Sequence, residues 1–212
     1  LQRSERATYV AMIDWDRYDL DDLPECDGQT LDAIRVVFPH GKHTEGIAVG
    51  EQIAEKGYRV FFQAANTLAY SDDDLVELAE EVNRVHPVAL SVVDTFGAMY
   101  NEDLERIVKI LDQKLEADIK LGFHSHNNQQ LSFALSMHFT ELLAQTGRGC
   151  IVDASLCGMG RGAGNATTEL TANYLNRKYH CNYDMNAIMD AIDMYMEYFQ
   201  ENYNWGYSTP YF

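Results

Sequence analysis

The fold class is decided by residues 87–123, which read PVALSVVDTFGAMYNEDLERIVKILDQKLEADIKLGF. This stretch begins and ends with short apolar runs of the kind that form buried strands. Between them, EDLERIVKILDQKL repeats its apolar residues at the spacing of an amphipathic helix. A helix between two almost wholly apolar strands predicts a parallel strand pair joined by a helical crossover.

The same pattern recurs along the chain, outward from this stretch in both directions. Strands are expected at residues 8–14, 33–38, 58–63, 87–94, 118–123 and 150–156. Alternating strands and helices fit either an open doubly wound sheet or a (β/α)8 barrel. Polar residues end several of the strands, as at the rim of a barrel where the chemistry gathers. We therefore predict an α/β fold, a (β/α)8 TIM barrel of which this chain holds about six βα units.

Composition excludes several classes of protein. The chain of 212 residues has 16 basic and 33 acidic side chains and a formal net charge of -17, which would repel a nucleic-acid backbone. No apolar run approaches the ~20 residues that cross a bilayer, so we expect a soluble, cytoplasmic protein. The four cysteines show no C-x-x-C spacing and are expected to be reduced and mostly buried.

Two regions are expected along the chain. Residues 1–181 are predicted to form a partial barrel with the catalytic function, and residues 182–212 a helix and an aromatic tail that pack on it. The Met- and Tyr-rich composition of the tail leaves a substrate lid, or a contact in a homo-oligomer, as the alternatives.

The segment GFHSHNN, which starts at Gly122, contains an H-x-H pair at the end of a predicted strand. Residues two apart in a strand face the same side, so His124 and His126 are expected to point together into the mouth of the barrel. Taken alone, such a pair is more often two core histidines than a metal site. Its position at the top of a barrel strand favours metal binding.

A glycine-rich loop, residues 158–164, follows the last predicted strand. A helix is expected to begin near Asn165, for which an asparagine N-cap is the structural interpretation. The functional interpretation is that four glycines let the backbone approach a ligand, and that N–H groups at a helix start attract carboxylate or phosphate.

Three motifs together resemble one enzyme family. HSHNNQQLSFALS, VDASLCGMGRGAGNATTE and VVDTFGAMYNEDL are similar to segments of the metal-dependent TIM-barrel lyases and acyltransferases, which include 4-hydroxy-2-oxovalerate aldolase and HMG-CoA lyase. The resemblance spans residues 8–176, taken as barrel strands three to eight. It implies that strands one and two lie outside this chain, and that the parent protein has about 300 residues or more.

The resemblance also implies roles for individual residues. The implied metal ligands are His124 and His126, with Asn165 as a weaker candidate. Asp94, Thr95 and Arg161 would be catalytic, and His40, Asn66, Gly160 and Gly162 would contact substrate. The cofactor would be a divalent metal, Mg or Mn. The catalytic base has no assignment, and the family's first-strand aspartate and arginine have no match in this sequence.

The implied reaction is carbon–carbon bond cleavage in a 2-oxo acid, such as a 4-hydroxy-2-oxo acid, through an enolate that a metal stabilises. Claisen-type acyl-CoA chemistry is the alternative within the family. HMG-CoA cleavage is disfavoured because the glycine-rich loop lacks the family's catalytic cysteine, and Cys157 precedes the loop.

Two further alternatives remain. A metal-dependent hydrolase would carry its H-x-H on the first strand of the barrel, with further ligands on later strands, which this sequence does not show. A barrel without activity, serving as a binding module, is the other alternative. An aspartate–arginine pair on a strand upstream of Leu1 would favour the enzyme.

Overall fold

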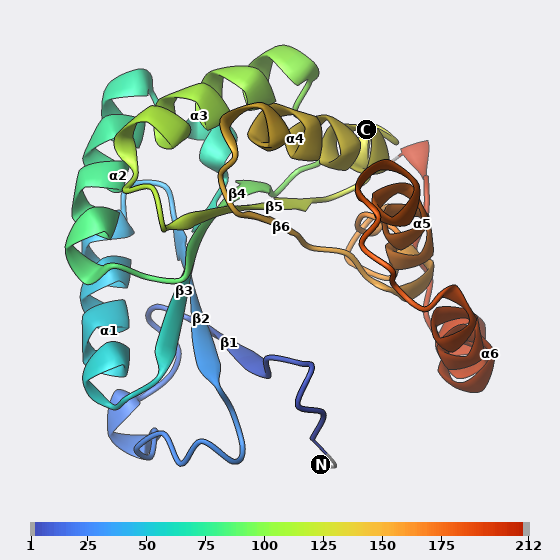
Figure 1. Ribbon diagram of the computed structural model, residues 1–212, viewed down its shortest axis with the longest axis horizontal. Coiled ribbons are helices and arrows are strands. Elements are labelled where there is room, and N and C mark those ends of the chain that lie inside the picture. Colours follow the sequence, from blue (N-terminus) through green and yellow to red (C-terminus); the bar gives the residue numbers. More distant parts are fainter. Residues whose placement is uncertain (1–2, 210–212) are drawn as a thin grey trace. The chain divides into compact units, whose positions relative to one another are not determined.

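The computed structural model describes residues 3–209 and confirms the alternation of strands and helices (Figure 1). The strands are β1 (Val10–Asp14), β2 (Ala33–Pro39), β3 (Arg59–Ala65), β4 (Ala89–Asp94), β5 (Lys120–Ser125) and β6 (Cys150–Val152). The α-helices are α1 (His43–Glu55), α2 (Asp72–Val85), α3 (Asn101–Lys114), α4 (Ser132–Thr146), α5 (Thr168–Tyr179) and α6 (Met185–Asn202). Short 3-10 turns lie at Leu20–Asp22, Thr67–Ala69 and Leu156–Gly158.

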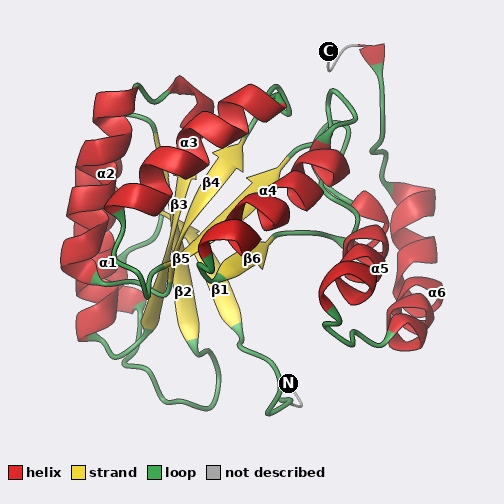
Figure 2. Cartoon of the chain, turned by 45° about the horizontal axis from the view of Figure 1, so that its top comes forward, coloured by secondary structure: helices red, strands yellow, loops and turns green. Residues whose placement is uncertain are grey.

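The strands form one parallel sheet in the order β1-β2-β3-β4-β5-β6 (Figure 2). Val10 pairs with Ala33 of β2, and Ala33 pairs in turn with Arg59 of β3. A doubly wound sheet reverses its strand order at a switch point, whereas the strands of a barrel follow one another in sequence. The observed order is that of a TIM barrel and confirms the predicted fold class, with six strands of a partial barrel in this chain.

The chain divides into two compact units. One contains the chain up to Val93, with Arg106–Gly122 and Arg148–Ile151. The other contains Asp94–Glu105, Phe123–Gly147 and the chain from Val152 onward. The expected boundary at residue 181 is a different division, and it stays a prediction.

In the first unit, α1 packs against β2 and β3 and against its neighbour α2 (Figure 1). Apolar residues of all four elements are fully buried, and the rings of Phe38 and Phe62 lie 5.8 Å apart. At the start of α2, the Ser71 hydroxyl accepts from the Asp74 N–H, and the Asp74 carboxylate accepts from the Ser71 N–H. This capping box fixes where α2 begins.

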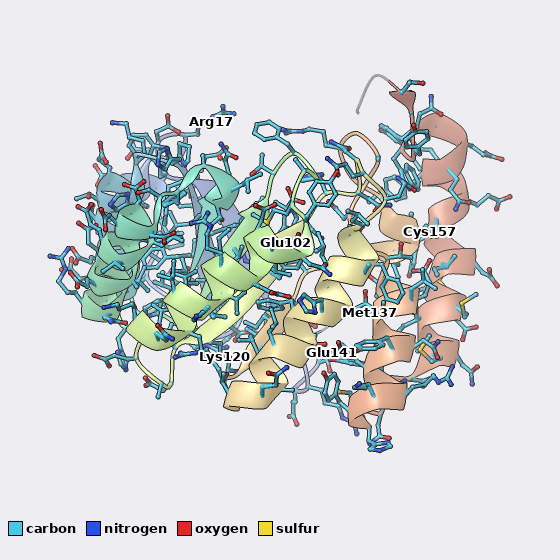
Figure 3. All side chains as sticks on the ribbon, turned by 90° about the horizontal axis from the view of Figure 1, so that it is seen from above. Arg17, Glu102, Lys120, Met137, Glu141 and Cys157 are labelled. Atoms are coloured by element: carbon cyan, nitrogen blue, oxygen red, sulfur yellow. The ribbon has the colours of Figure 1, made fainter. Side chains whose placement is uncertain are left out.

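In the second unit, α4 packs against α5, and α5 against α6. Glu141, labelled on α4 in Figure 3, accepts hydrogen bonds from the Tyr174 hydroxyl at 2.9 Å and from Lys178 Nζ at 3.2 Å. The predicted helix after residue 182 is α6, which begins at an N-cap formed by Asp184. In the tail, Trp205 Nε1 donates to the Cys157 carbonyl at 2.9 Å, and the Gly206 N–H donates to the Gly162 carbonyl at 3.4 Å, so the aromatic segment packs on the glycine-rich loop.

Two expectations are wrong. The helix expected near Asn165 begins at Thr168 with Thr167 as its N-cap, because residues 165–167 are held extended by bridges from Asn165 to His126 and from Thr167 to Ser155. The cysteines are free, as expected, but none is fully buried: Cys26 and Cys157 are half-buried, and Cys150 and Cys181 are exposed.

The helices of residues 3–209 include none that is both long enough and apolar enough to span a membrane.

Candidate metal centre

His124 and His126 lie side by side at the end of β5, and their ring centroids are 5.3 Å apart. His124 Nδ1 is 3.2 Å from the Asp153 carboxylate, which lies just after β6. The His124 side chain is 22% exposed and that of Asp153 is 15% exposed, so both are mostly buried. A carboxylate this close to Nδ1 favours the tautomer that carries its proton on that nitrogen. Nε2 of His124 is then the nitrogen that can bind a cation.

His126 is held by its backbone and by its ring. Its N–H donates to the Asp94 carbonyl at 3.1 Å, and ring Nδ1 is 3.3 Å from the Arg161 carbonyl. Because a carbonyl only accepts, Nδ1 is the protonated nitrogen. Burial, and then the neighbouring His124, lower the pKa of His126. The neutral form, which binds metals, is therefore favoured with Nε2 as the available atom.

Asn165 supplies an oxygen next to this pair. Its backbone bridges to that of His126, and its Nδ2 donates to the Met159 carbonyl at 3.0 Å. Its Oδ1 is shielded from solvent and has no hydrogen-bond partner within residues 3–209. Leaving a buried carbonyl oxygen without a partner costs about 1–3 kcal/mol. A cation would satisfy this oxygen, so the two imidazoles and this amide fit a divalent metal with mixed nitrogen and oxygen ligands.

The glycine-rich loop reaches the site through close backbone contacts. Gly160 lies against the Asn165 amide, and Gly162 lies against the Asn128 side chain. Gly164 has φ +91°, and a Cβ there would be only 2.1 Å from the Gly158 carbonyl oxygen, so no other residue fits. The Gly164 carbonyl accepts from the Asn127 N–H at 2.8 Å and joins the loop to the segment that follows the histidines.

Asp94 is buried, with 2% exposure, and both of its carboxylate oxygens are engaged. They accept from the N–H groups of Ala98 at 2.8 Å and Met99 at 3.2 Å. Burial raises the pKa of Asp94, and these hydrogen bonds oppose the shift. Asp94 therefore shapes the turn that lies against His126, and its predicted catalytic role, like that of Thr95 in the same turn, stays a prediction.

The remaining predicted site residues are distributed over both compact units. Arg161 reaches His126 through its backbone carbonyl, and its catalytic role stays a prediction. His40 and Asn66 belong to the first unit, where His40 Nε2 lies 3.3 Å from Asp74 Oδ2 and Asn66 adopts φ +55° after β3. Their substrate contacts, and those of Gly160 and Gly162, also stay predictions.

Two residues were missed in the sequence. Asp153 lies inside the strand predicted at residues 150–156, but β6 ends at Val152, so Asp153 comes directly after the strand and pairs with His124. Asn128 donates to the Phe96 carbonyl at 2.9 Å and accepts from the Ala163 N–H at 3.0 Å. It thereby joins the turn after β4 to the glycine-rich loop, and no feature of the sequence indicates this role.

Relatives with known names match this chain over part of their length. Oxaloacetate decarboxylase of Mycobacterium tuberculosis is 29% identical over 165 residues, which cover 77% of this chain and 47% of that protein. The 4-hydroxy-2-oxovalerate aldolase of Thermomicrobium roseum is 38% identical over 103 residues, or 48% of this chain and 27% of that protein. The chain therefore spans about half or less of these relatives.

Solved structures share the fold. The N-terminal domain of a candidate aldolase from Bacteroides vulgatus superposes with a TM-score of 0.80 at 24% identity, over 96% of this chain and 67% of that one. HMG-CoA lyase from Bacillus subtilis superposes with a TM-score of 0.74 at 17% identity, over 94% of this chain and 73% of that one. The model of the HMGL-like family matches residues 41–194. The resemblance expected from the three motifs is confirmed, and the chain belongs to the HMGL-like family.

Proposed function

We propose that the protein to which this chain belongs is a divalent-metal-dependent carbon–carbon lyase that acts on a 2-oxo acid, such as a 4-hydroxy-2-oxo acid. Three observations within one compact unit carry the proposal: the His124 and His126 rings lie 5.3 Å apart, the backbone of Asn165 bridges to that of His126, and Asn165 Oδ1 is buried without a partner among the described residues. Mg or Mn is the proposed metal.

When bound, the cation supplies positive charge at the oxygen on which negative charge develops as the carbon–carbon bond breaks. The chain's own residues prepare its site. Asp153 holds His124 in the tautomer that leaves Nε2 available, and the Arg161 carbonyl does the same for His126. Asn128 hydrogen-bonds both Phe96, in the turn after Asp94, and Ala163, in the glycine-rich loop, and so holds these two segments beside the site.

The names of the two relatives support the substrate class. Oxaloacetate and 4-hydroxy-2-oxovalerate are both 2-oxo acids, and loss of CO2 from the first or of an aldehyde from the second leaves the enolate of pyruvate. Decarboxylation of oxaloacetate is therefore a second candidate reaction, favoured by the relative that matches 77% of this chain. Assaying pyruvate release from each acid in turn distinguishes the two reactions.

Claisen-type acyl-CoA chemistry is less well supported. Residues 158–164 contain no cysteine, and Cys157, just before them, has a pKa raised by burial and by nearby Glu169. A thiol in that setting stays protonated and is a weak nucleophile. A metal-binding barrel without activity would bind the metal and release no pyruvate from either acid.

The proposal is tested in the full-length protein by measuring bound Mn²⁺ and pyruvate release. The variants are the His124→Ala/His126→Ala double variant and the control His138→Ala, whose histidine pairs with Glu105 on the surface. We expect the double variant to lose Mn²⁺ and activity, and the control to keep both. Unchanged Mn²⁺ occupancy in the double variant would refute the proposal.

A further inference from the structure

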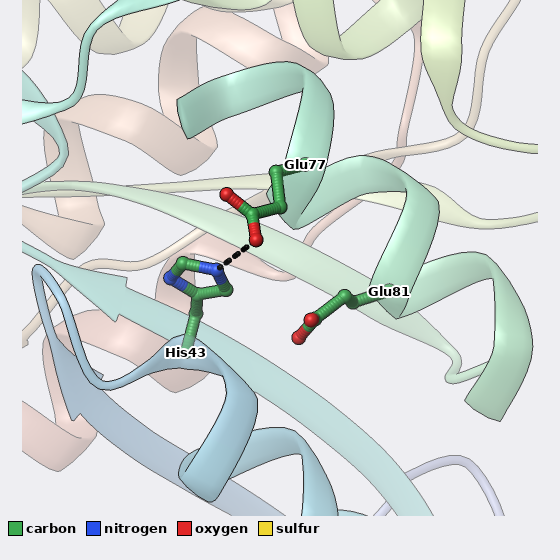
Figure 4. Close-up of side chains that lie close together, drawn as sticks. All are labelled: His43, Glu77 and Glu81. Atoms are coloured by element: carbon green, nitrogen blue, oxygen red, sulfur yellow. Dashed lines mark ion pairs between the residues drawn. The ribbon is translucent and has the colours of Figure 1, made fainter. Parts of the chain in front are cut away.

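A second group of metal-binding side chains lies between α1 and α2, in the first unit (Figure 4). His43 is the first residue of α1. Glu77 and Glu81 are one helical turn apart on α2, so they share a face of that helix. One ligand atom from each of the three residues lies within 4.8 Å of the others.

Three polar atoms of this cluster are buried without hydrogen-bond partners among the described residues. Both ring nitrogens of His43 and Oε2 of Glu81 are shielded from solvent and form no hydrogen bond with any described residue. The His43 side chain is 12% exposed and that of Glu81 is 15% exposed. His43 Nε2 lies 3.9 Å from Glu77 Oε1, which is too far for a hydrogen bond. Burying a polar atom without a hydrogen-bond partner costs free energy. Several such atoms in one place therefore indicate a ligand-binding site.

The neighbours orient these atoms without satisfying them. Glu81 Oε1 accepts from Thr44 Oγ1 at 3.1 Å and lies 3.8 Å from Arg84, whose side chain is 65% exposed. That leaves Oε2 as the unused oxygen of Glu81. The buried ring of Tyr70 lies 6.3 Å from that of His43.

We propose that His43, Glu77 and Glu81 bind a divalent transition-metal ion, with zinc as the preferred class, and so tie α1 to α2. A neutral imidazole with two carboxylates balances the charge of one divalent cation. Zinc accepts nitrogen and carboxylate ligands at about 2.0–2.2 Å in a tetrahedron, where a water would take the fourth position. The two glutamates can draw the ligand atoms together by rotation about their flexible side chains.

One imidazole and two carboxylates, with a water, make up the four ligands of a zinc site, whereas calcium takes about six to eight oxygen ligands. Because the ion would bind the folded protein and not the unfolded chain, it would stabilise the packing of α1 on α2. The site is independent of the proposed lyase site, whose histidines lie in the other unit.

A third cluster provides an internal control. His86, Glu116 and Asp118 also bring three ligand atoms within 4.8 Å of one another. All three residues are exposed, however, and both nitrogens of His86 are already paired, at 3.2 Å with Glu116 and 2.8 Å with Asp118. These side chains already satisfy one another without a metal, so this group is a set of surface ion pairs and not a metal site.

The test titrates Zn²⁺ alone into the full-length protein by calorimetry. The background is His124→Ala/His126→Ala, so that the other site does not contribute. Glu77→Gln removes a ligand whose side chain is 62% exposed, which keeps the risk of misfolding low. His43→Gln removes the nitrogen ligand, and His86→Gln is the matched control.

We expect one zinc equivalent in the background, a tenfold or greater loss of affinity in Glu77→Gln, no binding in His43→Gln and no change in His86→Gln. We also expect Zn²⁺ to raise Tm in the background and not in His43→Gln. The proposal is overturned if the background binds no zinc, or if His43→Gln and Glu77→Gln bind it as tightly as the background does.

Discussion

At the scale of single residues, the proposed lyase site depends on the orientation of His124 as much as on its identity. In the proposed site, the Asp153 carboxylate 3.2 Å from Nδ1 leaves Nε2 as the nitrogen for the metal. Replacing such a carboxylate typically costs about 10- to 100-fold in metal affinity. We therefore expect Asp153→Asn to weaken Mn²⁺ binding by about this factor, measured by calorimetry. The exposed Asp190→Asn should bind as the unmodified protein does, and equal affinities for both variants would contradict the role of Asp153.

Gly122 allows β4 and β5 to approach each other just before the histidines. A Cβ at this position would lie 2.2 Å from Ser91 Oγ and 3.1 Å from Ser91 Cβ. Overpacking of a core costs about 1–3 kcal/mol, so we expect Gly122→Ala to lower the free energy of unfolding by this amount in urea. Adding Ser91→Gly should restore part of the loss. Two losses that simply add would show that the side chains do not collide.

The Asp32 carboxylate makes the stability of the folded protein depend on pH in the acid range. Its carboxylate accepts from the Tyr9 N–H at 2.7 Å and from Arg3 at 2.6 Å, and these bonds lower its pKa below the ordinary value of 3.8. A lowered pKa in the folded state contributes stability above pH 3.8, and that contribution is lost as the pH falls through the folded value. We expect Asp32→Asn to flatten the acid limb of a Tm-against-pH curve. An unchanged acid limb would rule out this contribution.

At the scale of elements, one arginine hydrogen-bonds the carbonyl groups at the carboxyl end of α3. Arg148 pairs with the Asp112 carboxylate and donates to four backbone carbonyls, those of Asp112, Leu115, Glu116 and Ile119. Its side chain is 7% exposed, so its removal leaves buried acceptors without a donor. Breaking a buried pair typically costs about 3–5 kcal/mol.

We therefore expect Arg148→Met to lower the free energy of unfolding by about this amount in a urea titration. Arg177→Met, at an exposed position of α5, is the control and should change stability by less than about 0.5 kcal/mol. A loss for Arg148→Met as small as that of the control would show that water can replace the arginine.

The sequence indicates elements well where local periodicity decides them. The apolar run before His124 predicts β5, and the amphipathic pattern of residues 102–115 predicts α3. Local sequence places the start of α5 near Asn165, too early, because asparagine is a good N-cap. The backbone at Asn165 is instead paired with His126, some forty residues earlier in the chain, and such a long-range contact leaves no local signal.

At the scale of the whole molecule, periodicity identifies the strands but not their neighbours. Periodicity therefore fits both the barrel and the doubly wound sheet. The polar residues at the strand ends favour the barrel, and the sequential strand order confirms it. The same limit applies to the candidate site. His124 and His126 follow from the two-residue period of one strand, whereas Asp153 joins them only because β6 is the neighbour of β5.

The central claim is that the two imidazoles and the Asn165 amide hold one divalent cation. Anomalous diffraction from Mn²⁺-soaked crystals of the full-length protein tests it most directly. We predict a peak within about 2.0–2.3 Å of Nε2 of His124 and Nε2 of His126, with Asn165 Oδ1 as a further ligand. Manganese density elsewhere, with both rings outside bonding distance of the ion, would contradict the claim.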